Sequence, residues 1–143
     1  MMKHLFYLTM GVTLMSQPVK ADKVQIEINN IDTGRSGLLR VMLFAEDGFP
    51  KNHQKAIFTQ SIGSDKSTVS VLFFDIPDSF AIKVLHDENE DGKVSKNWTG
   101  ILPKEGLAFS NGARIRFGPP SFKSARIERK NMTVPVSINM IYP

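Results

Sequence analysis

Apolar and polar residues alternate with a period of two along much of the chain. In the first such stretch, polar residues separate Val24, Ile26 and Ile28. A period of two places successive side chains on opposite faces of an extended strand, so this stretch predicts a strand with one buried face and one face in water. The other stretches with this pattern are 56–62, 69–73, 80–84 and 132–140, and the sequence allows a further short strand at 125–129.

Residues 38–45 differ from this pattern because they are apolar almost throughout, with Arg40 as the exception. Such a run is typical of a central strand that is covered on both faces. The preceding residues 33–37 (Thr-Gly-Arg-Ser-Gly) favour a turn, so we expect 24–29 and 38–45 to form a hairpin. Pro135 has no N–H to donate, which predicts that strand 132–140 lies at a sheet edge or turns that side outward.

These stretches amount to about seven short strands, separated by turn signals at regular spacing. No segment shows an apolar period of 3.6 residues over three turns, as a helix would. The length of 143 residues suits about one domain, and no internal repeat indicates a second one. The sequence therefore predicts an all-β fold, an immunoglobulin-like or transthyretin-like β-sandwich of about seven strands with one long loop.

The long loop is predicted from Asp87 to Ser121, where about 35 residues show little alternation. Loops of this length inside a compact domain are usually functional, or they pack as small units of their own. If the protein has a site, we expect it in this segment.

The N-terminal 21 residues predict a cleavable signal peptide. A short basic start precedes an apolar run from Leu5 to Met15, and the short side chains of Val19 and Ala21 suit cleavage after Ala21. The alternative is a transmembrane anchor, but the run is shorter than the ~20 residues that span the hydrocarbon core. We therefore expect the mature protein to be a single domain, residues 22–143, that is exported and has no transmembrane anchor.

Charge and cysteine content narrow the classes of function. The formal net charge of +4 falls to +2 without Lys3 and Lys20, which lie in the predicted signal peptide. A nucleic-acid partner therefore has little support. The chain has no cysteine, which excludes disulfides, thiolate metal sites and cysteine nucleophiles.

The long loop opens with the pattern D-x-N-x-D-G, from Asp87 to Gly92. Oxygen ligands at positions 1, 3 and 5 converge on one cation when the chain turns tightly, and glycine at position 6 permits that turn. A carbonyl at position 7 and a group at position 9 add further oxygens. The predicted Ca²⁺ ligands are Asp87, Asn89, Asp91, Lys93 (through its carbonyl), Ser95 and Glu105.

Glu105 enters this set because position 12, where Ca²⁺ loops of this kind carry a bidentate Glu, is Trp98. Glu105 is the nearest acidic residue in sequence that could take that role. The alternative is a solvated turn without metal, because Asn, Asp and Gly are common turn residues for local reasons.

The rest of the long loop carries aromatic residues and arginines that suit a recognition surface. Aromatic rings present flat apolar faces, and arginine binds carboxylate or phosphate through two hydrogen bonds. The predicted surface consists of Trp98, Phe109, Asn111, Arg114, Arg116 and Phe117. The alternative is that the aromatic residues pack onto the sandwich as a second core, while the arginines form ion pairs with the acidic loop.

Catalytic residues are not indicated by the sequence. His86, Asp87 and Ser110 contain the residue types of a catalytic triad, but nothing in their spacing supports one. Ser110 also lacks a strand-to-helix elbow around it. Whether the protein is an enzyme stays open at this stage, with the balance against.

Several motifs together resemble a known bacterial family of exported proteins of unknown function, DUF2141. They are Val41–Phe44, Phe49–Pro50, His86–Lys93, Pro103–Gly106, Phe109–Asn111 and Phe117–Phe122. The resemblance covers roughly residues 24–140 and is most specific from Phe109 to Phe122. It implies a β-sandwich, mostly in the periplasm of Gram-negative bacteria, and it implies no activity. The family often has Asn where this chain has Asp91, a change that would strengthen cation binding.

We therefore predict an exported, non-enzymatic binding or adaptor module with a Ca²⁺-stabilised loop, periplasmic if the source is Gram-negative. Its partner would be another envelope protein or a small anionic ligand. One alternative is a small transthyretin-like hydrolase or isomerase, although the chain ends Met140-Ile141-Tyr142-Pro143 rather than in the Tyr-Arg-Gly-Ser signature of the purine-pathway members. The other is a structural envelope protein without a small ligand.

Overall fold

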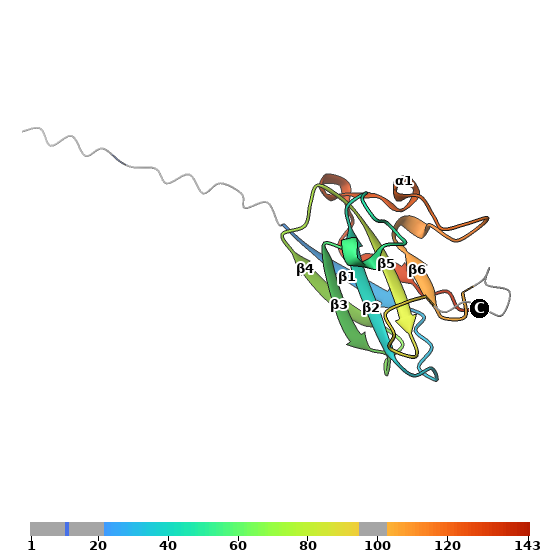
Figure 1. The fold of residues 1–143 in the computed structure, drawn as a ribbon. Coiled ribbons are helices and arrows are strands. Elements are labelled where there is room, and N and C mark those ends of the chain that lie inside the picture. The colour runs from blue at the N-terminus through green and yellow to red at the C-terminus, as the bar shows by residue number, and fades with distance from the viewer. Residues whose placement is uncertain (1–10, 12–21, 95–102) are drawn as a thin grey trace, which may run out of the picture.

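The computed structural model describes Gly11 and residues 22–94 and 103–143. Within this part of the chain eight strands form two sheets that pack face to face, as the predicted all-β sandwich requires (Figure 1). The strands are β1 (Lys23–Asn29), β2 (Leu38–Phe44), β3 (Phe58–Gly63), β4 (Val69–Phe74), β5 (Ser79–Asp87), β6 (Leu107–Phe109), β7 (Ile127–Glu128) and β8 (Val136–Asn139). The short helices are η1 (His53–Lys55), η2 (Ser110–Gly112), α1 (Phe122–Ala125) and η3 (Arg129–Asn131).

The smaller sheet has the order β4-β1-β8, with β1 antiparallel to β4 and parallel to β8. Its strands alternate buried and exposed residues, as the period of two predicts. β8 lies at the edge of this sheet and begins one residue after Pro135. The edge position inferred from that proline is therefore confirmed, since a residue without an N–H cannot complete a ladder on both sides.

The larger sheet has the order β3-β2-β5-β6, and β7 pairs with β5 beside this path. β2 is central, as predicted, but it does not form a hairpin with β1. That prediction is wrong because the two strands belong to different sheets and meet only through side chains across the core. The turn before β2 leads from one sheet to the other. Its Gly37 has a φ of 92°, and an added Cβ would lie 2.0 Å from the Asp87 carbonyl oxygen.

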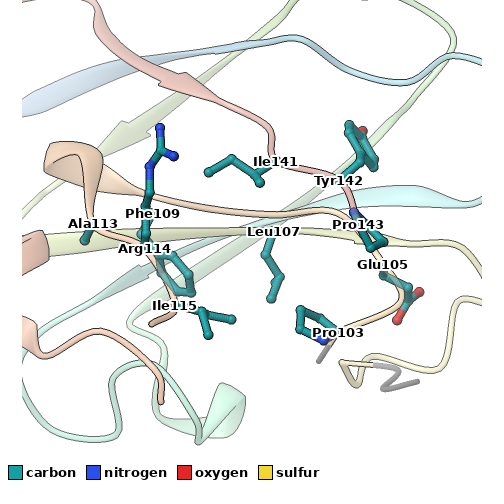
Figure 2. A pocket seen from close by; sticks show the side chains of 10 residues that line it. All are labelled: Pro103, Glu105, Leu107, Phe109, Ala113, Arg114, Ile115, Ile141, Tyr142 and Pro143. Carbon is teal, nitrogen blue, oxygen red and sulfur yellow. The ribbon is translucent and has the colours of Figure 1, made fainter. Parts of the chain in front are cut away.

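Both faces of the larger sheet are covered. The main core fills the space between the sheets, and a second apolar cluster covers the outer face: Met42, Phe44, Leu85, Leu107 and Phe109. Loop residues Phe49, Val94 and Ile115 pack against this second cluster. Figure 2 shows Leu107, Phe109 and Ile115 gathered on one side of β6. Burial on both faces explains why every residue of β5 from Phe80 to Asp87 is buried.

The segment 87–121 is less irregular than the sequence suggests. Its residues Leu107–Phe109 form β6, which pairs with β5 in register Lys83 to Phe109. A strand of three residues is too short to show an alternating pattern, so β6 was not among the strands that the sequence predicts. In the described part of the chain, no helix has the length and apolar character to cross a membrane. Ser95, Trp98 and the predicted signal peptide apart from Gly11 lie outside the described residues.

Candidate functional site

The acidic loop begins where β5 ends, at Asp87. This carboxylate is fully buried and accepts hydrogen bonds from Nε of Arg40 at 2.6 Å and from the N–H groups of Gly92 at 2.7 Å and Asp91 at 3.2 Å. Burial by itself would raise the pKa of Asp87, but these hydrogen bonds and the positive charge of Arg40 hold it below its ordinary value. Asp87 is thus a charged residue at the start of the loop, and its carboxylate bonds to the main chain of the loop at Asp91 and Gly92.

The loop turns tightly through two residues with positive φ, Glu90 (57°) and Gly92 (73°). The side chains of Asn89 and Asp91 bond to one another at 3.0 Å, and Asp91 Oδ1 accepts the N–H of Lys93 at 2.8 Å. These are the positions that the motif assigns to oxygen ligands, and the turn brings a carboxylate oxygen of Asp91 within 4.8 Å of one of Asp87.

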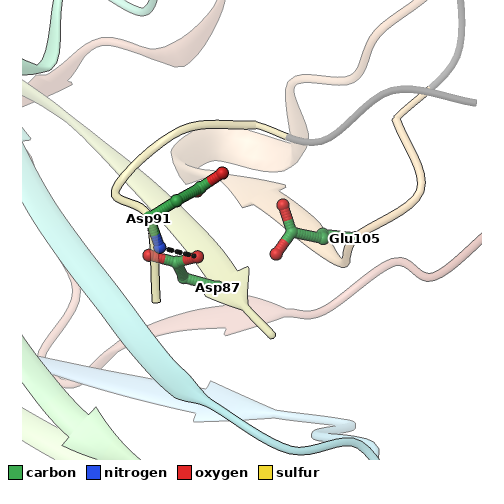
Figure 3. A group of neighbouring side chains, drawn as sticks. All are labelled: Asp87, Asp91 and Glu105. Atoms are coloured by element: carbon green, nitrogen blue, oxygen red, sulfur yellow. Dashed lines mark hydrogen bonds between the residues drawn. The ribbon is translucent and has the colours of Figure 1, made fainter. Parts of the chain in front are cut away.

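Glu105 reaches the same place from the other end of the long segment. It is 3% exposed, and its Oε2 accepts the N–H of Glu88 at 2.6 Å. One carboxylate oxygen from each of Asp87, Asp91 and Glu105 lies within 4.8 Å of the others (Figure 3). Carboxylate oxygens from three residues are hard ligands of the kind that a divalent cation such as Ca²⁺ takes.

A cavity of about 760 Å³ lies over the outer face of β5, beside the acidic loop. Its walls come from residues 50–54, from residues 91–94 and from Pro103, Leu107, Phe109, Ile115, Gly118 and Pro119. Lys83 of β5 also lines it and is only 4% exposed. Its Nζ donates to the Pro50 carbonyl at 2.8 Å and lies 2.8 Å from Nε2 of His53. In the described part of the chain no ion pair joins Lys83 to a carboxylate.

The protonation of His53 follows from its two contacts. Nδ1 lies 2.9 Å from the carbonyl oxygen of Gly92, which can only accept, so Nδ1 carries the hydrogen. Nε2 then has a free lone pair that accepts from Lys83. Burial, followed by the positive charge of Lys83, lowers the pKa of His53 below its ordinary value, which favours this neutral form.

Gly92 joins the acidic loop to the cavity. Its N–H donates to Asp87, while its carbonyl accepts from His53, which contacts Lys83. A chain of hydrogen bonds therefore links the loop to His53 and, through His53, to the amine of Lys83.

Sequence reasoning missed Lys83 and His53. Lys83 occupies a polar position of the alternating stretch 80–84, which predicts a side chain in water. His53 lies in a polar segment without any motif. The one signal in the sequence was that the two residues after Lys83, Val84 and Leu85, are both apolar. Consecutive apolar residues point to opposite faces of a strand, which indicates that the outer face of this strand is also covered.

The predicted recognition surface divides into buried and exposed members. Phe109 is buried in the second apolar cluster, as the packing alternative expected, although it also lines the cavity. Asn111 is exposed, with a φ of 57°, and its Nδ2 donates to the carbonyl of Ser124 at 3.1 Å. Arg114, Arg116 and Phe117 are exposed.

The suggested ion pairs between these arginines and the acidic loop do not form. The ion pairs of that loop within the described residues come from Arg40 to Asp87 and from Arg35 to Glu88. Arg114 instead borders an apolar depression of about 270 Å³ next to the C-terminal residues Ile141 and Tyr142 (Figure 2).

His86, Asp87 and Ser110 do not assemble as a triad. His86 lies 2.8 Å from the Tyr142 hydroxyl and 3.0 Å from the Ser36 carbonyl, so both ring nitrogens have partners. Ser110 Oγ accepts from the N–H of Ile82 and donates to the Ala125 carbonyl. These contacts are those of buried structural residues.

Comparison with known proteins gives one match. No curated protein and no solved structure matches the chain. The model of the family described as an uncharacterized protein conserved in bacteria, DUF2141, matches residues 17–137, which is most of the sequence. The motifs quoted above and this match agree, and the chain belongs to the DUF2141 family.

Proposed function

We propose that the protein is an exported binding module that holds a small carboxylate-bearing ligand in the cavity over β5. The observation that carries this proposal is Lys83, a buried amine whose contacts in the described residues are a carbonyl and an imidazole. Burying an ammonium group without an anionic partner is costly. A carboxylate in the cavity would supply that partner.

The composition of the cavity supports the same class of ligand. Lys51, His53 and Lys93 add positive or polar groups, while Val94 and Ile115 belong to an apolar wall. Asp91 also lines the cavity, and its exposed side chain carries a negative charge among these positive groups. A small ligand with one carboxylate and a short apolar part fits these surroundings. Export is supported by the predicted signal peptide, since β1 begins two residues after the expected cleavage at Ala21.

Calorimetric titration with short-chain carboxylates, such as acetate, butyrate and lactate, tests the proposal. We expect at least one to bind the wild type and to bind Lys83→Met at least 10-fold more weakly, because a buried charge pair is worth on the order of 1.4 kcal/mol or more. Lys66→Met is the control, since Lys66 is an exposed lysine between β3 and β4, apart from the residues that line the cavity. Equal losses in the two variants, or no binding of any carboxylate by the wild type, would contradict the proposal.

We further propose that Ca²⁺ stabilises the acidic loop. The ligands would be Asp87, Asn89, Asp91, the Lys93 carbonyl, Ser95 and Glu105, a set of hard oxygens of the kind that Ca²⁺ prefers. The approach of Glu105 to Asp87 and Asp91 supports this set, because it provides the last carboxylate that the local motif lacks. Bound there, Ca²⁺ would hold the loop in place. Through its carbonyl, Gly92 then fixes His53 at the cavity.

Thermal unfolding in EDTA, in millimolar Ca²⁺ and in millimolar Mg²⁺ tests the cation site. At ~100-fold excess over Kd, binding to the folded state adds about 2.7 kcal/mol, so we expect Ca²⁺ to raise the Tm by several degrees. Glu105→Gln should remove this rise, because Gln keeps an acceptor for the N–H of Glu88 but loses the charge. Glu90→Gln removes a charge from the same loop outside the carboxylate cluster and should keep the rise. A rise that survives in Glu105→Gln would disprove this ligand set.

A further inference from the structure

The amine of Lys83 is placed to react as well as to bind. We propose that Lys83 captures the carbonyl carbon of a small aldehyde or 2-oxo acid as a reversible imine, with His53 moving the protons. This inference rests on the proposed function in one respect, since a 2-oxo acid is a carboxylate-bearing ligand with a reactive carbonyl beside the carboxylate.

The contacts of Lys83 favour a nucleophilic amine. Nζ has one covalent bond to Cε and two hydrogen-bond partners, the Pro50 carbonyl and Nε2 of His53. One of its four tetrahedral directions therefore remains for a ligand in the cavity, open to a carboxylate while Nζ is an ammonium and to a carbonyl carbon once Nζ is a neutral amine. Neither partner is an anion, so neither holds the group in its ammonium form as a carboxylate would. A desolvated lysine of this kind is the usual source of imines in proteins.

The surroundings of Lys83 change its acidity in the direction that the reaction needs. Burial lowers the pKa of Lys83 to about 8. The charged and titratable groups around it are His53 from η1 and Lys51, Asp91 and Lys93 from the loops that line the cavity. The strands on either side of Lys83 place Met42 and Phe109 beside it, which carry no charge. Arg40 and Asp87 act on His53 and not directly on the amine.

The chemistry balances without any oxidant or reductant. His53 Nε2 accepts a proton from the Lys83 ammonium, and rotation about the Cε–Nζ bond turns the freed lone pair of Nζ from His53 toward the cavity. The lone pair attacks the carbonyl carbon, whose C–O π electrons move to oxygen. That oxygen takes the proton from His53, and Nζ then gives a second proton to His53, which leaves a neutral carbinolamine. His53 returns this proton to the hydroxyl, and water leaves as the lone pair of Nζ forms the N=C bond. One ammonium and one carbonyl thus give one protonated imine and one water, and His53 is neutral at the start and at the end.

Reductive trapping tests the inference on the mature protein. The protein is incubated with pyruvate and sodium cyanoborohydride at pH 7, and the modified lysine is located by peptide mass mapping. With a pKa of about 8 against about 10.4 for exposed lysines, the neutral fraction of Lys83 at pH 7 is roughly 200-fold larger. We therefore expect one adduct per chain, on Lys83, and a labelling rate that rises to a midpoint near pH 8. Adducts spread over the exposed lysines, or a midpoint near pH 10, would overturn the proposal.

Three variants and one ligand pair complete the test. Lys83→Arg keeps the positive charge but cannot form an imine, so its adduct should disappear, whereas Lys66→Arg, at an exposed lysine between β3 and β4, should be labelled like the wild type. His53→Gln should slow labelling of Lys83 by about 100-fold if His53 moves the protons. Lactate has the carboxylate of pyruvate without the oxo group. If both acids bind equally and no adduct forms, the imine is wrong and the carboxylate site stands. If neither acid binds and no adduct forms, both proposals fail.

Discussion

Asp87→Ala is expected to lower the free energy of unfolding by about 3–5 kcal/mol even in the absence of metal. The carboxylate is fully buried and accepts hydrogen bonds from Arg40 and from two main-chain N–H groups. Its removal leaves the guanidinium of Arg40, 25% exposed, without its anion. It also leaves the N–H of Gly92 without its acceptor, and the N–H of Asp91 with the longer bond to Asn89 Oδ1 at 3.4 Å. Asp87 therefore supports the loop independently of any cation, which is why Glu105 is the better probe of the metal site.

Chemical denaturation of the variant in EDTA measures this loss. Asp47→Ala is the control, because Asp47 pairs with Lys55 on the surface, where such a pair is worth about 0–1 kcal/mol. Adding Arg40→Met to Asp87→Ala should recover part of the stability, since it removes the uncompensated charge. A loss in Asp87→Ala no larger than that in Asp47→Ala would show that the buried pair does not hold the loop.

Lys83→Met is expected to flatten the dependence of stability on pH above neutrality. The pKa of Lys83 is about 8 in the folded protein and about 10.4 in the unfolded chain, so between these values the unfolded chain binds more protons. The stability of the wild type should therefore rise with pH across that window, by about 3 kcal/mol in total. Methionine has no proton to lose, so this rise is absent from the variant.

Urea denaturation of both proteins at intervals from pH 7 to pH 10 gives the comparison, with Lys51→Met as the control that should follow the wild type. Burial raises the pKa of Tyr142, so this residue changes the pH dependence of stability only at pH values near and above its ordinary pKa. Its contribution is the same in all three proteins. The difference between wild type and Lys83→Met thus isolates Lys83. Parallel curves for these two proteins would mean that the amine is not desolvated.

The strands were largely visible in the sequence, and their partners were not. Alternation shows which face of a strand is buried, because that face must be apolar, but it carries no information about which strand lies alongside. For this reason β1 and β2 were predicted as a hairpin, although each pairs within a different sheet. The edge position of β8 was predictable, because Pro135 removes a backbone donor wherever it occurs.

The candidate site also combines local features that the sequence determined with long-range contacts that only the tertiary structure decided. The sequence by itself determined the turn from Asp87 to Gly92, because its hydrogen bonds and positive φ angles are local properties of Asp, Asn and Gly. Only the tertiary structure decided that Glu105 completes the carboxylate cluster, since the pairing of β6 with β5 brings it back to Asp87. Only the tertiary structure buried Lys83, because distant residues such as Pro50 and Ile115 cover a strand face that alternation assigns to water.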